Sequence, residues 1–518
     1  MLLKKYFYEY LKLDQTFAAS IGEPCDKNIY TNYYSHYFII EYKKLLIKYN
    51  KLSKNSNDLY DKNLFIISKN NLDLLNIRYY LFPLNCSNNI ITLFKDLNEI
   101  YYKINSDNDY NFLISRIKCF PDIVETIIMR LNEGINNNLT ISKFSCNKII
   151  SQLKGFLKHN LYIIDVPKKY YNNDYLNIIN NNYKKPIIHI LNFLDKTYFK
   201  YCQDGIGLCK LKNGKTIYKA FVKSQISLDL LPQQIYNIGL KEVNKIENEL
   251  SKLMYKTTNI KKLKNYYTYM NNKDNIYKNS SLQYKDFIRK RSIINKKIIN
   301  KYFHEKVENY NIKFVKKELE NSSPAAYYYP VSKNEKSYFY LNRKLTKYKY
   351  DTFTLSIHEG VPGHHYQYRL MLNNNIPNYK IYSTQESGFS EGWALYTENL
   401  GNDYYTDLDN YGKLSYELLR AIRLIVDVGI NYYNWSYKKA YKYMNNYTSL
   451  DSNNIKNELL RYIDDPGQAL AYKIGELEII RLRDKYLKNN IGTIKDFHKE
   501  LLSKGVLTLK LYEYSLFK

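Results

Sequence analysis

Apolar residues recur at spacings of three and four along most of this chain, and Asn-rich turns interrupt the pattern. This spacing places apolar side chains on one face of an α-helix, where they can pack against a core. We therefore expect a mainly α fold. The segments that show the pattern most clearly are 36–50, 121–136, 145–158, 233–255, 283–307, 412–433, 435–446, 453–463 and 467–489.

Strand character is confined to two short regions. One is residues 203–222, where a turn is expected at Gly214-Lys215. The other is a pair of segments, 325–329 and 337–341, joined by a polar connection that contains a proline. Such a connection is typical of a hairpin. The sequence thus predicts a small β element within a helical protein.

The length of 518 residues is enough for a large core and for more than one domain. We find no internal repeat. A boundary near residue 225 is expected to separate an N-terminal helical region, 1–225, from a catalytic region, 226–518, which the first would cover. A single domain is the alternative.

The formal net charge of +28 comes almost wholly from Lys, which accompanies a surplus of Asn, Ile and Tyr. An AT-rich genome over-supplies these four residues, so the charge indicates coding bias and a solvated surface. No run of five or six consecutive basic residues occurs. The alternative, a basic nucleic-acid-binding protein, lacks any recognised binding module. We expect no specific nucleic-acid partner.

The six cysteines include no CxxC pair and are expected to be free thiols in a reducing compartment. The first fifteen residues have the pattern of an amphipathic helix and not of a signal peptide. No stretch of 18 apolar residues occurs. These features predict a cytoplasmic protein that does not associate with a membrane.

Rare residues gather at 358–365, a segment with three of the eight histidines and one glutamate. In the zincin motif H-E-x-x-H, two His one helical turn apart bind zinc, and the Glu is general base toward the metal-bound water. This segment departs from that spacing. His364 and His365 follow His358 by six and seven residues.

Helix geometry limits how these residues can meet. On an unbroken helix, residues six apart point in different directions, and residues seven apart are separated by about 10.5 Å along the axis. Pro362-Gly363 is expected to kink or bulge the helix. A two-residue bulge would make His364 the second ligand. His365 would then face the side of the site, where it could support a ligand or contact the substrate. Glu359, directly after His358, is the candidate general base.

The wider sequence resembles a known family, the bacterial proteins grouped as the domain of unknown function 885, which are distantly similar to gluzincin zinc metallopeptidases. Weaker agreement at 131–142 and 231–250 extends the resemblance over most of the chain. It implies a large helical metallopeptidase-like fold with a deep cleft and a small β hairpin at the active-site edge. The segments that carry it are TLSIHEGVPGHHYQ (354–367), SEGWALYTE (390–398), LLRAIRLIVDVG (418–429) and RYIDDPGQALAYKIGELEIIRLR (461–483).

The resemblance also implies one Zn²⁺ per chain and its ligands. In related peptidases a Gly-His pair follows the motif's Glu, which favours His364 over His365 as the partner of His358. A gluzincin takes its third ligand from a Glu on a later helix, and Glu391 matches that position. The residues expected to support the ligands or to contact substrate are His365, Gln367, Glu398 and Asp427.

Similar enzymes stabilise the oxyanion with an Arg-Tyr pair on a late helix, and Arg461-Tyr462 looks like its counterpart. Tyr472 is the rival for this role. The strand at 337–341 resembles the edge that holds extended peptide substrates. The family usually has a His where this chain has Asn431, so no acid-base role is expected there.

Together these features predict a zinc-dependent hydrolase, a carboxypeptidase-like or dipeptidase-like peptidase that acts on a peptide or small amide. The alternative is an inactive relative that works as a binding or scaffold protein. The sequence determines neither the cleavage direction nor the oligomeric state.

Overall fold

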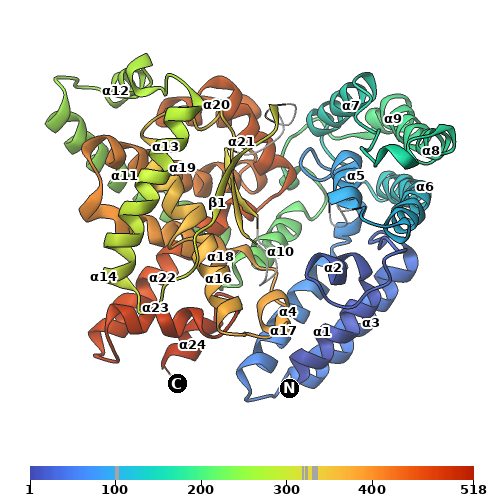
Figure 1. Cartoon of the computed structure of the whole chain (residues 1–518), viewed down its shortest axis with the longest axis horizontal. Coiled ribbons are helices and arrows are strands. Elements are labelled where there is room, and N and C mark those ends of the chain that lie inside the picture. Colours follow the sequence, from blue (N-terminus) through green and yellow to red (C-terminus); the bar gives the residue numbers. More distant parts are fainter. Residues whose placement is uncertain (100–103, 318–319, 321–324, 330–335, 518) are drawn as a thin grey trace. The chain divides into compact units, whose positions relative to one another are not determined.

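The computed structural model describes residues 1–99, 104–317, 320, 325–329 and 336–517. Helices make up nearly all the regular structure of these residues, with one three-stranded sheet (Figure 1). The predicted mainly α fold is confirmed.

The chain forms two compact units. Unit 1 contains Met1–Phe221 together with two later segments, Ile430–Tyr437 and Asn457–Pro466. Unit 2 contains the remaining segments, Val222–Gly429, Lys438–Lys456 and Gly467–Lys518. Each unit therefore contains more than one segment of the chain.

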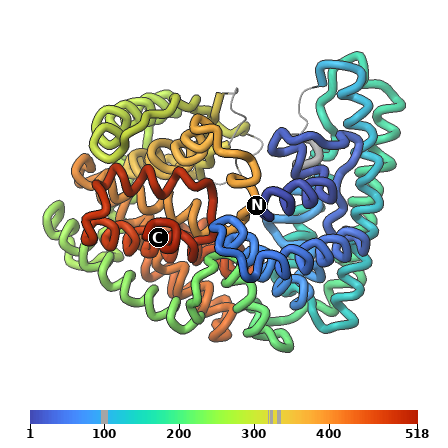
Figure 2. The backbone as a smooth tube through the Cα atoms, turned by 90° about the horizontal axis from the view of Figure 1, so that it is seen from below, coloured from blue at the N-terminus to red at the C-terminus, as the bar shows by residue number. Residues whose placement is uncertain are grey.

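Unit 1 is helical. Helices α1, α3 and α4 pack side by side (Figure 2). A second core forms around α6, whose Leu113, Ile117, Phe120 and Val124 are buried at helical spacing. The helices are α1 Leu2–Leu13, α2 Gln15–Ser20, α3 His36–Ser53, α4 Leu59–Asn76, α5 Ile90–Glu99, α6 Asp107–Asn136, α7 Lys143–Lys158, α8 Asn173–Ile179 and α9 Lys185–Lys196.

Two sequence expectations for unit 1 differ from the structure. Helix α6 extends toward the N-terminus through Pro121, beyond the predicted start, because the apolar stripe continues upstream. The strand expected within 203–222 is wrong. Short 3-10 turns and helix α10, Gly214–Ile226, occupy this region. Its β-branched and aromatic residues had suggested a strand, but Ile217, Tyr218 and Val222 are buried at helical spacing.

Unit 2 carries the sheet and the remaining helices. The long predicted helices are present with ends shifted by a few residues, except that the one at 283–307 is divided by a π-helical segment, Ile294–Ile299. The helices are α11 Pro232–Thr257, α12 Leu263–Met270, α13 Ser280–Ile293, α14 Asn300–Tyr302, α15 Asp351–Leu355, α16 His364–Asn373, α17 Asn378–Tyr382, α18 Ser387–Glu398, α19 Asp407–Asn431, α20 Tyr437–Tyr447, α22 Ala471–Lys488, α23 Ile494–Leu502 and α24 Leu511–Phe517. Helix α21, Ser452–Asp464, begins in unit 2 and belongs to unit 1 from Asn457 onward.

The sheet has the strand order β1-β3-β2. Strand β3, Tyr338–Leu341, pairs in parallel with β1, Asn311–Phe314, and antiparallel with β2, Ala326–Tyr329. The predicted hairpin of β2 and β3 is confirmed, and its connection at 330–335 lies outside the described residues. The expectation that 337–341 is an edge strand is wrong, since β1 and β2 occupy both sides of β3. Strands β1 and β2 are the two edges.

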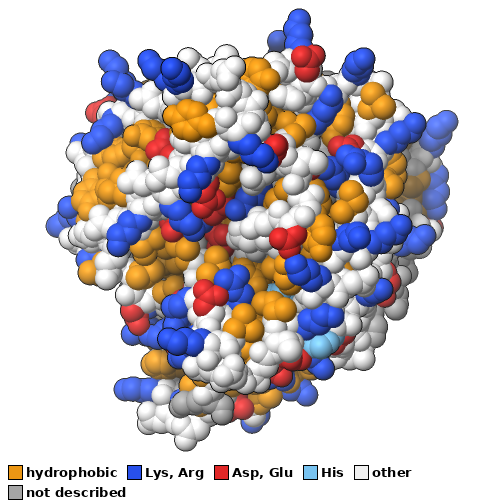
Figure 3. All heavy atoms as spheres, turned by 90° about the vertical axis from the view of Figure 1, so that its left-hand side faces the viewer, with side chains coloured by type: hydrophobic (Ala, Val, Ile, Leu, Met, Phe, Trp, Pro, Cys, Tyr) orange, Lys and Arg blue, Asp and Glu red, His pale blue; other side chains and the backbone are white. Residues whose placement is uncertain are grey.

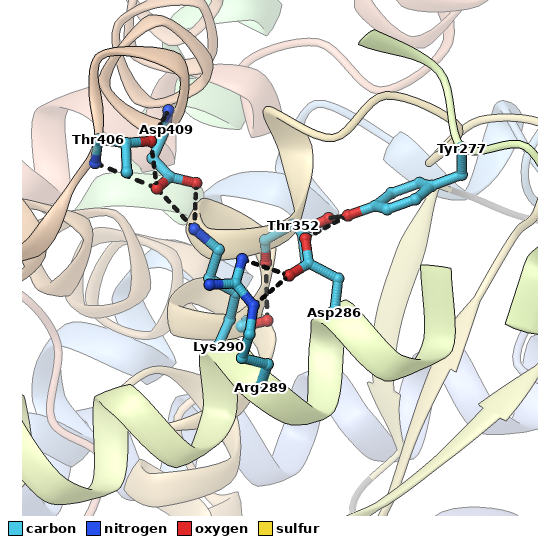
Figure 4. Close-up of polar contacts among 8 residues, drawn as sticks. Tyr277, Asp286, Arg289, Lys290, Thr352, Thr406 and Asp409 are labelled. Carbon is cyan, nitrogen blue, oxygen red and sulfur yellow. Dashed lines mark hydrogen bonds and ion pairs between the residues drawn. The ribbon is translucent and has the colours of Figure 1, made fainter. Parts of the chain in front are cut away.

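Polar contacts fix the helix that leads into the histidine cluster (Figure 4). The Tyr277 hydroxyl donates to the Asp286 carboxylate on α13, at 2.5 Å, and lies 2.6 Å from the hydroxyl of Thr352 on α15. Lys290 on α13 donates to both carboxylate oxygens of Asp409, at 2.6 Å each, and both side chains are buried. Helix α13 thereby joins α15 to the start of α19.

Helices α18 and α22 approach closely at three glycines. A Cβ atom on Gly475 would lie 2.0 Å from the carbonyl oxygen of Gly388, and one on Gly392 would lie 2.5 Å from the Gly475 backbone. No side chain fits at this crossing. The glycines therefore set the separation of the two helices.

The N-terminal end of α18 holds a buried carboxylate, that of Glu386. Its Oε1 accepts from the Leu509 amide at 3.0 Å. Burial raises the pKa of Glu386 to about 8, and hydrogen bonds from Ser227 and Leu509 oppose this only in part. The folded protein therefore favours the protonated form of this side chain.

None of the described helices has the length and apolar character needed to cross a membrane. On the face drawn in Figure 3, Lys and Arg side chains are scattered among Asp and Glu. This distribution is the one expected of a solvated surface.

We predict that Gly475→Ala destabilises the protein, because the added methyl group forces α18 and α22 apart. Overpacking of this kind costs roughly 1–3 kcal/mol. Thermal unfolding measures the effect. The matched control is Gly155→Ala in helix α7, where a Cβ meets no atom within 4 Å. The control should be neutral or slightly stabilising. Equal unfolding temperatures for the two variants would contradict the close-packing argument.

We predict that Glu386→Gln becomes more stable relative to the parent as the pH rises. Between its ordinary value near 4.5 and about 8, the unfolded chain binds fewer protons at Glu386 than the folded chain. The contribution of Glu386 to stability is thus full below pH 4.5 and is lost as the pH rises toward 8, by up to about 1.4 kcal/mol per pH unit. Urea unfolding at pH 5, 7 and 9 tests this. A difference between the proteins that is constant with pH would show that Glu386 is not the titrating group.

Candidate metal centre

The histidine motif interrupts a helix, as Pro362-Gly363 predicted. Helix α15 continues into a π-helical turn, Ser356–Gly360, and α16 begins anew at His364. Residues 361–363 form the turn between them. His358 thus stands at the end of one helical segment and His364 at the start of the next, which removes the long separation that an unbroken helix would impose.

The turn depends on a close approach of main-chain atoms. The amide of Gly363 donates to the carbonyl oxygen of Ile357 at 3.0 Å. A Cβ on Gly363 would lie 1.9 Å from the carbonyl oxygen of His358, so only glycine fits. The indole of buried Trp393, on α18, donates to the Pro362 carbonyl at 2.9 Å. This bond ties the turn to the helix that carries Glu391.

Three predicted ligands come together at this turn. Oε2 of Glu391 lies 3.6 Å from Nε2 of His358 and 3.4 Å from Nε2 of His364. One possible ligand atom from each of the three side chains lies within 4.8 Å of the others. The side chain of His358 is buried, and those of His364 and Glu391 are 15% and 20% exposed. The cluster is therefore partly accessible.

This donor set fits a zinc ion. Ligand atoms about 2.0–2.2 Å from zinc at tetrahedral angles lie about 3.3–3.6 Å apart, which matches the separations of 3.6 Å and 3.4 Å in the structure. Oε2 of Glu391 is buried and accepts no hydrogen bond from the described residues. Two imidazole nitrogens and one carboxylate oxygen are also a usual set for catalytic zinc. A bound cation would supply the partner that this buried carboxylate oxygen, between two histidines, lacks.

The charges of the cluster support one another. Burial disfavours the charged form of His358, but the carboxylates of Glu391 and Glu398 outweigh it and raise its pKa to about 9. Burial likewise raises the pKa of Glu391, but His358 and His364 hold it well below its usual range. The site therefore favours an ionised carboxylate next to positive charge.

Glu398 orients His358 from behind. Its Oε1 lies 2.8 Å from Nδ1 of His358, so the ring nitrogen that faces Glu391 is Nε2. Glu398 itself is buried, with Arg420 of α19 at 3.8 Å. A carboxylate in this position fixes the ring orientation of a metal-binding histidine.

Glu359 lies beside the cluster and is held by the sheet. Its Oε2 accepts from the backbone amide of Tyr328, on edge strand β2, at 2.9 Å. Burial raises its pKa, while His364 and His358 lower it in part. A carboxylate with a raised pKa, next to two histidines, is suited to accept a proton.

The side chains of His365 and Gln367 form no hydrogen bond with Glu391, whereas Nε2 of His364 lies 3.4 Å from its carboxylate. Nε2 of His365 lies 2.6 Å from the carbonyl oxygen of Glu308, and burial lowers the pKa of His365 to about 4. It is thus a neutral ring that donates to a carbonyl. Gln367 is buried, and its amide makes no hydrogen bond with the described residues. The structure places His364, and not His365, next to Glu391.

Of the candidates for oxyanion stabilisation, Tyr472 lies at the cluster, in unit 2. Its ring is stacked on that of His358, with centroids 6.4 Å apart, and the guanidinium of Arg423 lies over the Tyr472 ring, 4.7 Å from its centroid. Arg461 and Tyr462 belong to unit 1. The predicted role of that pair at the metal stays a prediction.

Tyr462, Asn431 and Asp427 have defined hydrogen-bond partners. The Tyr462 hydroxyl donates to Glu458 at 2.6 Å. The amide of Asn431 donates to the Tyr462 carbonyl at 2.9 Å. The carboxylate of Asp427 accepts from the Gly467 amide, which precedes α22. Asp427 thus supports the turn before the helix of Tyr472.

Sequence reasoning missed Tyr328, Arg420 and Arg423. Tyr328 acts through its backbone amide, which side-chain patterns do not reveal. The two arginines left a signal, since they are charged residues on the apolar face of α19 and both are buried. Buried cations need a partner nearby, and here these partners are Glu398 and the ring of Tyr472.

Unit 2 also has a cavity of about 390 Å³ away from this cluster. Arg481 and Lys510 line this cavity, where Arg481 is paired with Glu478 and Glu513, and Lys510 with Asp229. The wall has apolar residues but no group of metal-binding side chains among the described residues. The cavity therefore offers less chemistry than the histidine cluster.

Comparisons with known proteins agree with this fold. The solved structure of a "putative lipoprotein" from Colwellia psychrerythraea is similar at a TM-score of 0.86, with 19% identity over 99% of this chain and 98% of that one. Another, from Shewanella oneidensis and described as of unknown function, gives 0.74, with 15% identity over 100% and 99%. No curated protein matches the chain. The model of one family matches residues 42–515. By that match, this chain belongs to the family described as "Bacterial protein of unknown function (DUF885)".

Proposed function

We propose that this protein is a zinc-dependent amide hydrolase, and specifically a peptidase. One observation carries the proposal: Glu359, held by the Tyr328 amide, lies next to a cluster of two imidazoles and one carboxylate that together suit a zinc ion. His358, His364 and Glu391 would hold the ion. A zinc ion in such a site activates water and polarises the carbonyl under attack.

The residues of this chain would perform the remaining steps. Glu359 accepts a proton from the attacking water and passes it to the leaving amine, so that the C–N bond breaks and a carboxylic acid and an amine form. The phenol of Tyr472, next to His358, would donate a hydrogen bond to the oxyanion. Glu398 keeps the His358 ring oriented.

The substrate proposed is a peptide or another small amide. A cytoplasmic location of this chain remains a prediction. The description as a lipoprotein belongs to the two similar proteins. The second candidate function is that of an inactive relative with a binding role. Asn431 favours this candidate, because the family usually has a His at this position. The side-chain amide of Asn431 instead donates a hydrogen bond to the Tyr462 carbonyl.

We predict that Glu359→Gln retains zinc but loses most of its activity. The amide keeps the size of the carboxylate and removes its ability to accept a proton, and such groups contribute roughly 10²-fold to 10⁴-fold in rate. Cleavage of a randomised peptide library, followed by mass spectrometry, identifies a substrate. The rate on that substrate is then measured for both proteins.

His358→Ala is the companion variant. It should lose both zinc and activity, because two remaining ligands hold zinc poorly. A Glu359→Gln protein as fast as the parent would exclude Glu359 as the base. Loss of zinc from Glu359→Gln would indicate a metal site of a different design.

We predict that Glu398→Gln weakens zinc binding by about 10-fold to 100-fold, because the carboxylate that orients His358 is removed. Competition with a chromogenic chelator measures the affinity without any substrate. Glu500→Gln is the matched control, since Glu500 is 47% exposed on α23 and pairs with Lys504. Equal zinc affinities in Glu398→Gln and the control would show that this carboxylate does not position the ligand.

A further inference from the structure

A pair of tyrosines borders the candidate metal centre. Tyr368 lies one helical turn beyond His364 on α16, so the two side chains share a face of the helix. Burial raises the pKa of Tyr368 to about 12, with smaller contributions from Tyr382, Tyr328 and the carboxylate of Glu391. The helical spacing therefore places Tyr368 beside His364, on the same face of α16.

Tyr328 connects this pair to the candidate base. Its backbone amide donates to Glu359, and its ring centroid lies 6.3 Å from that of Tyr368, with the planes tilted by 34°. The Tyr328 hydroxyl lies 3.0 Å from that of Ser337. This hydrogen bond fixes the ring of Tyr328 against strand β3. Tyr328 thus holds the proposed general base, Glu359, with its backbone amide and presents its own aromatic ring beside that base.

Both rings are partly accessible. The side chains of Tyr328 and Tyr368 are neither fully buried nor exposed. A molecule bound at the cluster can therefore contact the two rings.

Two ring faces beside a metal-binding cluster suit an apolar partner. Aromatic surfaces bind aliphatic and aromatic groups by dispersion and by edge or offset contacts, and they give little to a charged carboxylate. We propose that Tyr328 and Tyr368 form a subsite that receives an apolar, preferably aromatic, side chain next to the scissile amide. This inference rests on the proposed function, because that function places the scissile amide at the metal.

The test uses the full-length, zinc-loaded protein and the hydroxamic acids of glycine, leucine and phenylalanine. The hydroxamate group binds zinc in each, so only the side chain differs. By calorimetry, we expect the phenylalanine compound to bind at least about 10-fold more tightly than the glycine compound, as apolar subsites discriminate by factors of this size. In Tyr368→Ala this ratio should fall below about 3-fold, with zinc content unchanged.

Two further variants separate the ring from other effects. Tyr368→Phe keeps the ring and should keep the ratio. Tyr269→Ala removes a tyrosine that is 50% exposed on α12, and it should leave the ratio as in the parent. Equal binding of the three compounds to the parent protein would overturn the proposal. So would a Tyr368→Ala protein that binds all three more weakly by the same factor.

Failure of the proposed function gives a different result. A protein that binds no zinc contradicts the metallohydrolase itself, and the subsite is then tested on the metal-free protein with N-acetyl-phenylalanine amide and N-acetyl-glycine amide. Saturation-transfer NMR should detect the first and not the second. The signal should be lost in Tyr368→Ala and kept in Tyr368→Phe. No difference between the two amides would overturn the subsite as well.

Discussion

The whole candidate site depends on one close approach of main-chain atoms, that of Gly363 to the carbonyl oxygen of His358. A side chain at Gly363 would occupy the position of that oxygen. Because glycine allows the approach, the chain ends one helical segment at Gly360 and begins another at His364. Two histidines six residues apart then meet across a turn. The Trp393 indole holds the Pro362 carbonyl and so links this turn to the helix of Glu391.

Charge compensation is the second requirement of the interior of unit 2. His358 lies between two carboxylates, and Glu398 in turn lies near Arg420. Farther along α19 and α22, buried Lys413 and Lys473 pair with Glu417. Isolated buried ions are costly, and paired ones become tolerable only when the geometry is good. The helices that carry the candidate site are therefore fixed by packing at the glycines and by ion pairs inside.

The helical pattern predicted most of the fold because burial on one face requires regular spacing. The helices expected at 233–255, 412–433 and 467–489 are present, as Pro232–Thr257, Asp407–Asn431 and Ala471–Lys488. The pattern failed at 203–222, where Val, Tyr and Phe suit either a strand or a buried helix face. Short apolar runs do not distinguish the two, and the packing of α10 decided it. Strand β1 was missed because four residues with one fully buried side chain carry no clear pattern.

For the site, the sequence by itself determined which residue types are available: an uncommon group of histidines with a glutamate, a helix break at Pro362-Gly363, and a later Glu391. These follow from local chemistry, since proline and glycine act on their own turn. Only the tertiary structure decided that His364, and not His365, faces Glu391, and that the Tyr328 amide holds Glu359. It also made β3 the central strand. Such choices depend on which distant segments pack together, and residue spacing along the chain does not contain that information.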